Sequence, residues 1–269
     1  MVESLKELNQ LCQKPNYKEV GNWMVRRMLR DAALPMTWLL LHTHVTANQV
    51  TFVSLIFGLA GAIFFTFLSP VFFLAGALCL QFWYYLDHVD GQIARYRKTA
   101  SLSGRFHDFI VHHIIHGMII FCLGFYVFRV TELIFTIALG FIGSMGIMMF
   151  NLISDVKCKT FIERLLSCDS VQILHTEAGP KSVRSHELQR PFLKVFSFFH
   201  KAIEIHVLMN TLAFAAVIQI FLWRSLDTRF WLFFFYSLMA PFLATIKLTY
   251  VIWLKKIDQE FNGQFRTNV

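Results

Sequence analysis

The chain has 269 residues, of which 56% are hydrophobic and only 16% are charged. A water-soluble domain of this length cannot bury so much apolar surface inside itself, so the composition excludes that class and predicts a polytopic membrane protein. The formal net charge of +8 is explained by membrane topology and by attraction to anionic membrane lipids. No nucleic-acid partner is needed to account for it.

The region before the first apolar run is polar and charged, and we expect no cleavable signal peptide in it. Its apolar and basic side chains separate onto two faces of a helix, which predicts an amphipathic helix that lies in the membrane interface. The apolar face holds Val20, Trp23, Met24 and Met28, and the basic residues off that face are Arg26, Arg27 and Arg30.

Uncharged apolar runs follow, each close to the roughly 20 residues that a helix needs to cross a bilayer. The runs cover residues 49–68, 70–86, 109–128, 133–154, 205–223 and 230–246. They lack the period-two alternation of barrel strands, and helices satisfy the backbone in lipid. We therefore predict an all-α fold with six transmembrane helices. In the fourth run, Gly140, Gly143 and Gly146 predict a close helix-packing face or a dimer contact.

Basic residues are concentrated in alternate connections between these runs. The other connections contain only three basic residues, namely Arg129, Arg224 and Arg229. By the positive-inside rule, both termini and the connection between the second and third runs face the cytoplasm. We expect a protein of the bacterial inner membrane or an equivalent membrane. Residues 1–48 would form a cytoplasmic N-terminus with the interfacial helix, residues 49–256 the six-helix domain, and residues 257–269 a cytoplasmic tail.

Acidic residues gather where the second and third runs meet the cytoplasm. Asp87 and Asp90 are three residues apart, and Asp108 and His112 are four residues apart. Each pair shares a helical face, and the two faces can point toward each other. Carboxylates that converge near hydrocarbon are costly without a cation among them. Hard divalent cations prefer oxygen ligands, so we predict that the three aspartates bind such cations.

Small and basic residues beside the aspartates suit a phosphorylated ligand. Gly91 and Ala94 leave room for a ligand directly against the helix, and the cations of Arg95, Arg97 and Lys98 lie where its phosphates would rest. For these basic residues, a role as positive-inside anchors is an equally good interpretation. For the aspartates, the alternative is a structural ion-pair network with nearby arginines.

The spacing of these residues resembles the signature of the CDP-alcohol phosphotransferase (CDP-alcohol phosphatidyltransferase) family. The matching residues are Asp87, Asp90, Gly91, Ala94, Arg95, Gly104 and Asp108. The resemblance implies a six-helix enzyme, usually a homodimer, that acts in phospholipid or related biosynthesis. It would pass a substituted phosphoryl group from a CDP-linked donor, commonly CDP-diacylglycerol, to an alcohol acceptor, with release of CMP. The residues implied in donor binding are Asp87, Gly91, Ala94, Arg95, Gly104 and Asp108. The cations implied are Mg²⁺ or Mn²⁺, as two ions held by Asp87, Asp90 and Asp108.

A second segment supports the same resemblance. Residues 46–51 are similar to the family's Thr-Pro-Asn-x-x-Thr entry to the first transmembrane helix, with Ala47 in place of proline. The resemblance adds Asn48 to the candidate binding residues.

His112 stands where the family pattern has a fourth aspartate, which is regarded as the base that deprotonates the acceptor. A neutral imidazole can take the same proton, and we predict that His112 is the catalytic base. As a metal ligand instead, it would tilt the preference from Mg²⁺ toward Mn²⁺. His116 continues the same helical stripe and is placed to hydrogen-bond His112, although a packing role explains it as well.

Three classes of function are compatible with this sequence. The first is the metal-dependent transferase, and the second is a binding protein of the same fold whose turnover is impaired by the histidine. The third is an ion transporter, but its ionisable residues would be spread across the membrane depth, whereas here the acids cluster at one face. We therefore favour the transferase.

Overall fold

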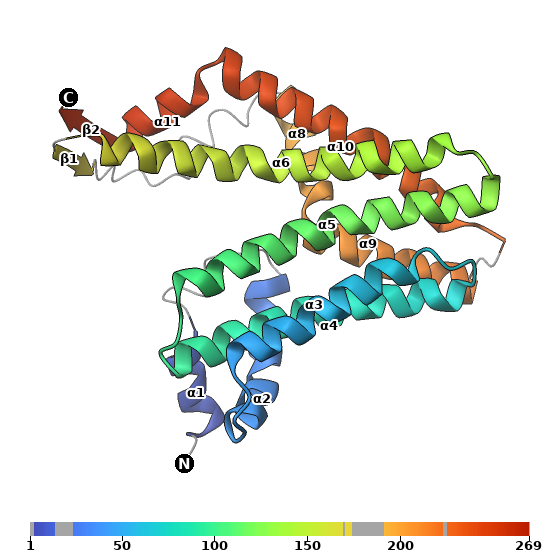
Figure 1. Ribbon diagram of the computed structural model, residues 1–269, viewed down its shortest axis with the longest axis horizontal. Coiled ribbons are helices and arrows are strands. Elements are labelled where there is room, and N and C mark those ends of the chain that lie inside the picture. The colour runs from blue at the N-terminus through green and yellow to red at the C-terminus, as the bar shows by residue number, and fades with distance from the viewer. Residues whose placement is uncertain (1–2, 14–23, 169, 174–190, 223–224, 269) are drawn as a thin grey trace.

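The computed structural model describes residues 3–13, 24–168, 170–173, 191–222 and 225–268, and most of them are helical (Figure 1). The elements in chain order are α1 (Leu5–Cys12), η1 (Val25–Leu29), α2 (Arg30–Leu41), α3 (Ala47–Phe64), α4 (Pro70–Tyr96), α5 (Leu102–Thr131), α6 (Phe135–Leu166), β1 (Ser170–Ile173), α8 (Pro191–Ile203), α9 (Ile205–Val217), η2 (Ile218–Leu222), α10 (Thr228–Trp253), α11 (Lys256–Gln264) and β2 (Phe265–Asn268). The two elements labelled η are π-helical.

Five of the described helical segments are long and apolar enough to cross a membrane, namely α3, α5, α6, α9 together with η2, and α10. This confirms the prediction of an all-α polytopic membrane protein. The second predicted run, 70–86, forms most of α4, which is not among the five. Polar and aromatic residues near Asp87 lower the mean hydropathy of that helix. The count of six spans therefore stays a prediction, although α4 runs beside α3 along the bundle (Figure 1).

Side-chain caps fix the beginnings of the helices that carry the motif. The Thr46 hydroxyl accepts a hydrogen bond from the Gln49 amide, and the Gln49 side chain accepts one from the Thr46 amide. At the start of α5, the Ser101 hydroxyl accepts from the Gly104 amide at 3.0 Å. Such caps satisfy amides that have no partner within the helix. They set where α3 and α5 begin, and so where their first turns place side chains.

Glycines bring α6 close to the two helices that flank it. Gly140 meets Gly124 of α5, while Gly143 and Gly146 lie against the backbone of α10. A Cβ atom at Gly146 would stand 2.4 Å from the backbone nitrogen of Pro241. The glycine spacing therefore packs helices within one chain, as the first of the two interpretations predicts.

The region before α3 is more extensively folded than a single interfacial helix. Helix α1 packs against α2 and α4, and η1 continues directly into α2. Of the predicted apolar face, Val20 and Trp23 lie outside the described residues. Met24 packs against the core, whereas Met28 is 56% exposed.

The predicted C-terminal tail folds back along the end of α6. Strand β2 pairs antiparallel with β1, so that Phe265 stands opposite Ile173. The ring of Phe161 on α6 contacts the rings of Phe261 and Phe265. The described ends of the chain lie toward the same end of the long helices as the connection between α4 and α5 (Figure 1).

Candidate active site between α4 and α5

The site lies where α4 ends and α5 begins. Tyr96 is the last residue of α4, Leu102 is the first of α5, and Lys98 between them has a left-handed backbone with φ of 56°. This tight reversal turns the chain back, and the side chains of Asp87 on α4 and His112 on α5 meet between the two helices. Asp87 and Asp108 each lie on the side of their helix that faces the other helix, as the periodicity predicts.

Asp87, Asp108 and His112 come together across this junction. The Nε2 atom of His112 lies 3.1 Å from Oδ1 of Asp87 and 3.2 Å from Oδ1 of Asp108. One ligand atom from each residue lies within 4.8 Å of the other two. Two carboxylates and one imidazole form a suitable donor set for a divalent ion, so these residues fit a metal site. The nitrogen ligand is compatible with Mn²⁺ as well as Mg²⁺.

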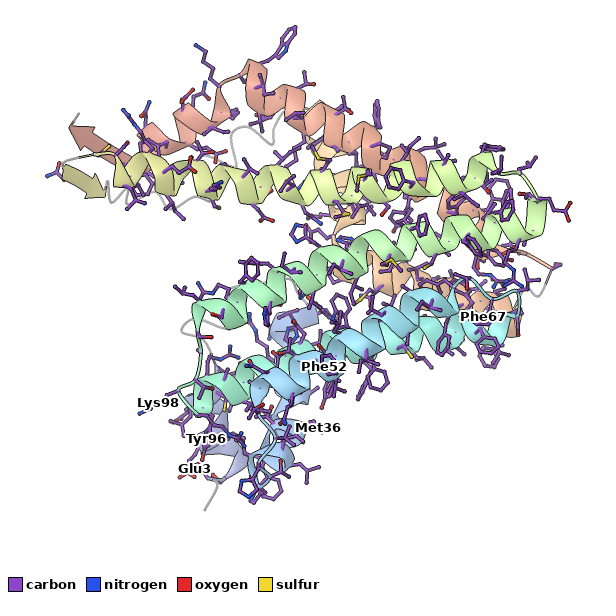
Figure 2. All side chains as sticks on the ribbon, in the orientation of Figure 1. Glu3, Met36, Phe52, Phe67, Tyr96 and Lys98 are labelled. Carbon is purple, nitrogen blue, oxygen red and sulfur yellow. The ribbon has the colours of Figure 1, made fainter. Side chains whose placement is uncertain are left out.

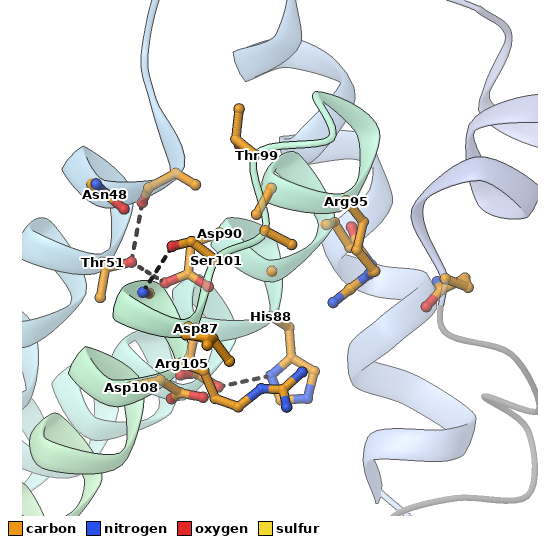
Figure 3. Close-up of a pocket in the computed structure, with 18 of the residues that line it drawn as sticks. Asn48, Thr51, Asp87, His88, Asp90, Arg95, Thr99, Ser101, Arg105 and Asp108 are labelled. Atoms are coloured by element: carbon orange, nitrogen blue, oxygen red, sulfur yellow. Dashed lines mark hydrogen bonds and ion pairs between the residues drawn. The ribbon is translucent and has the colours of Figure 1, made fainter.

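Asp90 is not a member of this group. Its carboxylate accepts a hydrogen bond from the Thr51 hydroxyl of α3 at 2.6 Å (Figure 3). Burial and the negative charge of Asp87 raise the pKa of Asp90 to about 8. Burial also acts to raise the pKa of Asp87, but the charge and hydrogen bond of His112 outweigh it and lower that pKa to about 2. The two neighbouring carboxyl groups thus differ in their affinity for a proton.

A cavity of about 390 Å³ opens beside these residues. It is lined by most of the predicted site residues: Asn48, Asp87, Asp90, Gly91, Ala94, Arg95, Gly104 and Asp108. Figure 3 shows the three aspartates with Thr51, Arg95 and Arg105 around it. The cavity thus combines acidic and basic groups, as a site for a metal and a phosphorylated ligand requires.

The Arg95 side chain lies beside Gly91, which is one helical turn earlier on α4. Its Nε donates a hydrogen bond to the backbone carbonyl of Cys12. A Cβ atom at Gly91 would lie 3.1 Å from Nη1 of Arg95. The glycine therefore leaves room for the guanidinium to lie along α4 at the cavity wall.

The remaining predicted residues lie outside the cavity lining. Arg97 donates to the backbone carbonyls of Val45 and Thr43 at 2.6 and 2.9 Å, so it ties the α2–α3 connection to α4. Lys98 stands in the turn between α4 and α5. His116 is buried, and its Nδ1 lies 3.1 Å from Nδ2 of Asn151 on α6. His112 is not among the residues that line the cavity, but its Nε2 contacts Asp87 and Asp108, which are.

Several cavity residues were not predicted from the sequence. Thr51 could have been found, because it is the last position of the segment 46–51. His88, Ser101 and Arg105 lie between motif residues and show no spacing of their own. Gln13 and Arg30 reach the cavity from far earlier in the chain. Only the packing of the N-terminal helices against α4 brings them there.

Residues 44–165 match the sequence profile of the CDP-alcohol phosphatidyltransferases. This region, a little less than half of the chain, is similar to that family. The matched region runs from just before α3 to the end of α6 and contains the whole motif, from Asp87 to His112. Members of the family transfer a phosphoalcohol from a CDP-alcohol in phospholipid synthesis. No curated protein matches the chain significantly.

Proposed function

We propose that this protein is an active, metal-dependent CDP-alcohol phosphotransferase that uses a CDP-linked lipid such as CDP-diacylglycerol as its donor. The observation that supports the proposal best is the convergence of Asp87, Asp108 and His112 beside the cavity. A second observation is the set of cavity residues that match the family motif. Together they support a site in which metal ligands and phosphate contacts surround one space.

The residues have distinct roles in the proposed reaction. Asp87 and Asp108 would hold the metal together with Asp90, and a bound Mg²⁺ or Mn²⁺ supplies charge stabilisation for the donor phosphates. Arg95 would contact the donor pyrophosphate, and Gly91 leaves space for it at the surface of α4. The acceptor oxygen attacks the phosphorus that carries the lipid, a new P–O bond forms, and the bond to the CMP phosphate breaks.

His112 would remove the proton of the acceptor alcohol. In the structure its Nε2 faces the carboxylates of Asp87 and Asp108. In the metal-free site the positive charge of His112 lowers the pKa of Asp87, and a divalent cation on these carboxylates would favour the neutral imidazole. A neutral imidazole that donates through Nε2 carries its lone pair on Nδ1, so Nδ1 is the atom that would take the proton. The carboxylates then orient the ring and stabilise the imidazolium that forms, as a carboxylate does in other histidine-based sites.

The proposal is tested by CMP release from CDP-diacylglycerol by the purified protein, with Mg²⁺ or Mn²⁺ and a mixture of alcohol acceptors. We expect metal-dependent release that Asp108→Asn and His112→Ala each reduce by about a hundredfold or more, since loss of a catalytic base alone costs about 10²–10⁴ in rate. Asp258→Asn is the matched control, because Asp258 is an exposed acid on α11.

Donor binding without CMP release, across the whole acceptor mixture, would contradict the transferase and support the binding protein. In that protein, the histidine in place of the fourth aspartate would have ended turnover.

A further inference from the structure

Helix α1 is a short amphipathic helix with a well-formed start. The Ser4 hydroxyl accepts from the Glu7 amide, and the Glu7 side chain accepts from the Ser4 amide, which is a capping box. Leu8 and Cys12, one turn apart, are fully buried. They belong to a hydrophobic cluster with residues of α2 and α4, including Leu86 and Val89. The apolar face of α1 is therefore packed against the end of α4 that carries the site.

Hydrogen bonds also hold the beginning of α1 against the end of α4 and against α2. The Tyr96 hydroxyl, at the end of α4, donates to the Glu3 carboxylate. The indole Nε1 of Trp38 on α2 donates to the Glu3 backbone carbonyl at 3.2 Å. Figure 2 shows Glu3 and Tyr96 together at this end of the molecule. The start of α1 is thus held by one bond from each of the helices on which it packs.

The end of α1 reaches the cavity. The Cys12 carbonyl at its C-terminus accepts the hydrogen bond from Nε of Arg95, and the next residue, Gln13, lines the cavity. Carbonyls at a helix C-terminus carry partial negative charge and bind cations favourably. With Nε held in this way, Nη1 of Arg95 lies beside Gly91.

From this geometry we infer that α1, through the Cys12 carbonyl at its C-terminus, holds Arg95 in position to bind the donor pyrophosphate. This inference rests on the proposed function and deepens it. Helix α1 precedes the region that matches the family, so this support for Arg95 comes from outside that region. Leu8, Glu3 and Tyr96 act as positioning residues, because they act through Arg95.

The expected size of the effect follows from conformational entropy. A free arginine side chain samples many rotamers, and a ligand that must immobilise it loses affinity. Ordering one such side chain changes affinity by about two- to tenfold. Release of α1 should therefore weaken binding of the nucleotide without removing the metal ligands.

The test measures binding of CDP in the presence of Mn²⁺ by isothermal titration calorimetry, using the full-length protein. Leu8→Asp places a charge in the buried α1 interface, and we expect it to raise the dissociation constant for CDP by about tenfold. Tyr96→Phe removes only the bond to Glu3 and should raise it by a smaller factor. Leu11→Asp is the matched control, because Leu11 is on the same helix but 53% exposed.

A double-mutant cycle with Arg95→Ala shows whether α1 acts through that arginine. In the Arg95→Ala background, Leu8→Asp should cause almost no further loss of CDP affinity, since coupled residues are not additive. Binding of Mn²⁺ alone, followed by electron paramagnetic resonance, should stay the same in both single variants.

The outcomes separate the inference from the proposed function. CDP binding that Arg95→Ala weakens, but that Leu8→Asp and Tyr96→Phe leave at the wild-type level, overturns the inference and leaves the transferase intact. Fully additive effects of Leu8→Asp and Arg95→Ala also overturn it. A wild-type protein that binds no CDP with Mn²⁺ overturns both.

Discussion

Among individual residues, Asp87 and Asp90 show how neighbouring carboxylates acquire different properties. They stand one helical turn apart, yet His112 lowers the pKa of Asp87, whereas burial and the charge of Asp87 raise the pKa of Asp90 to about 8. The hydrogen bond from Thr51 opposes this rise but does not cancel it. Asp90 is therefore protonated at neutral pH until a cation binds nearby.

This difference predicts pH-dependent metal binding. The pKa of Asp90 rises from its usual 3.8 to about 8 on folding, so the metal-free folded state binds the extra proton, and its stability falls as pH rises from about 4 to 8. A metal needs the carboxylate form. The increase in melting temperature caused by Mg²⁺ should grow from pH 6 to 8 and level off above it. In Asp90→Asn, the increase in melting temperature caused by Mg²⁺ should not change between pH 6 and 8. If it still grows with pH as in the wild type, a group other than Asp90 causes the pH dependence.

Helical periodicity predicts that Asp87 and Asp108 lie on facing stripes, and in the structure both carboxylates contact His112. The partners of these residues were not predictable. Nothing in the sequence indicates that His112 contacts two aspartates while Asp90 bonds to Thr51, since these contacts depend on the rotation of α3 and α5 relative to α4. The separation of Asp90 from the other acids is thus a result of helix packing.

At the scale of elements, glycines decide how closely the long helices approach. The periodic Gly140, Gly143 and Gly146 indicated close packing but not the partner helix. The structure assigns Gly140 to α5 and the other two to α10. Close contact of helix backbones is a common way for membrane helices to associate without a hydrophobic driving force.

Replacing Gly146 by alanine should therefore destabilise the bundle. The added Cβ would stand 2.4 Å from the backbone nitrogen of Pro241, so the clash is with backbone and not with a flexible side chain. We expect a loss of about 1–3 kcal/mol in stability, seen as a melting temperature lower by several degrees in detergent. Gly263→Ala is the control, because a Cβ there would meet nothing within 4 Å. Equal melting temperatures for the two variants would contradict this packing.

For the whole molecule, the described chain ends and the α4–α5 junction lie at one end of the long helices, whereas the α5–α6 connection lies at the other (Figure 1). This arrangement allows the proposed topology, in which the site and both termini face the cytoplasm. The homodimer implied by the family resemblance remains a proposal, which the mass of the protein–detergent complex in light scattering can test.

The orientation predicts which side of the membrane exposes Cys158, an exposed cysteine on α6. In a variant whose other four cysteines are alanine, a membrane-impermeant maleimide should label Cys158 in inside-out vesicles and not in right-side-out vesicles. A second variant that lacks Cys158 and carries Leu133→Cys should show the opposite pattern, because Leu133 is 50% exposed at the α5–α6 connection. Labelling of Cys158 from outside would reverse the proposed topology.

The sequence by itself determined the membrane class, the helical fold and the positions of the motif residues, because composition and periodicity are local properties of the chain. Only the tertiary structure decided which group of the N-terminal region holds Arg95 at the cavity. The bond between Arg95 and the Cys12 carbonyl joins residues 83 positions apart, and it uses a backbone acceptor that every residue possesses. Such a contact leaves no pattern in the sequence, since it depends only on where the buried face of α1 packs.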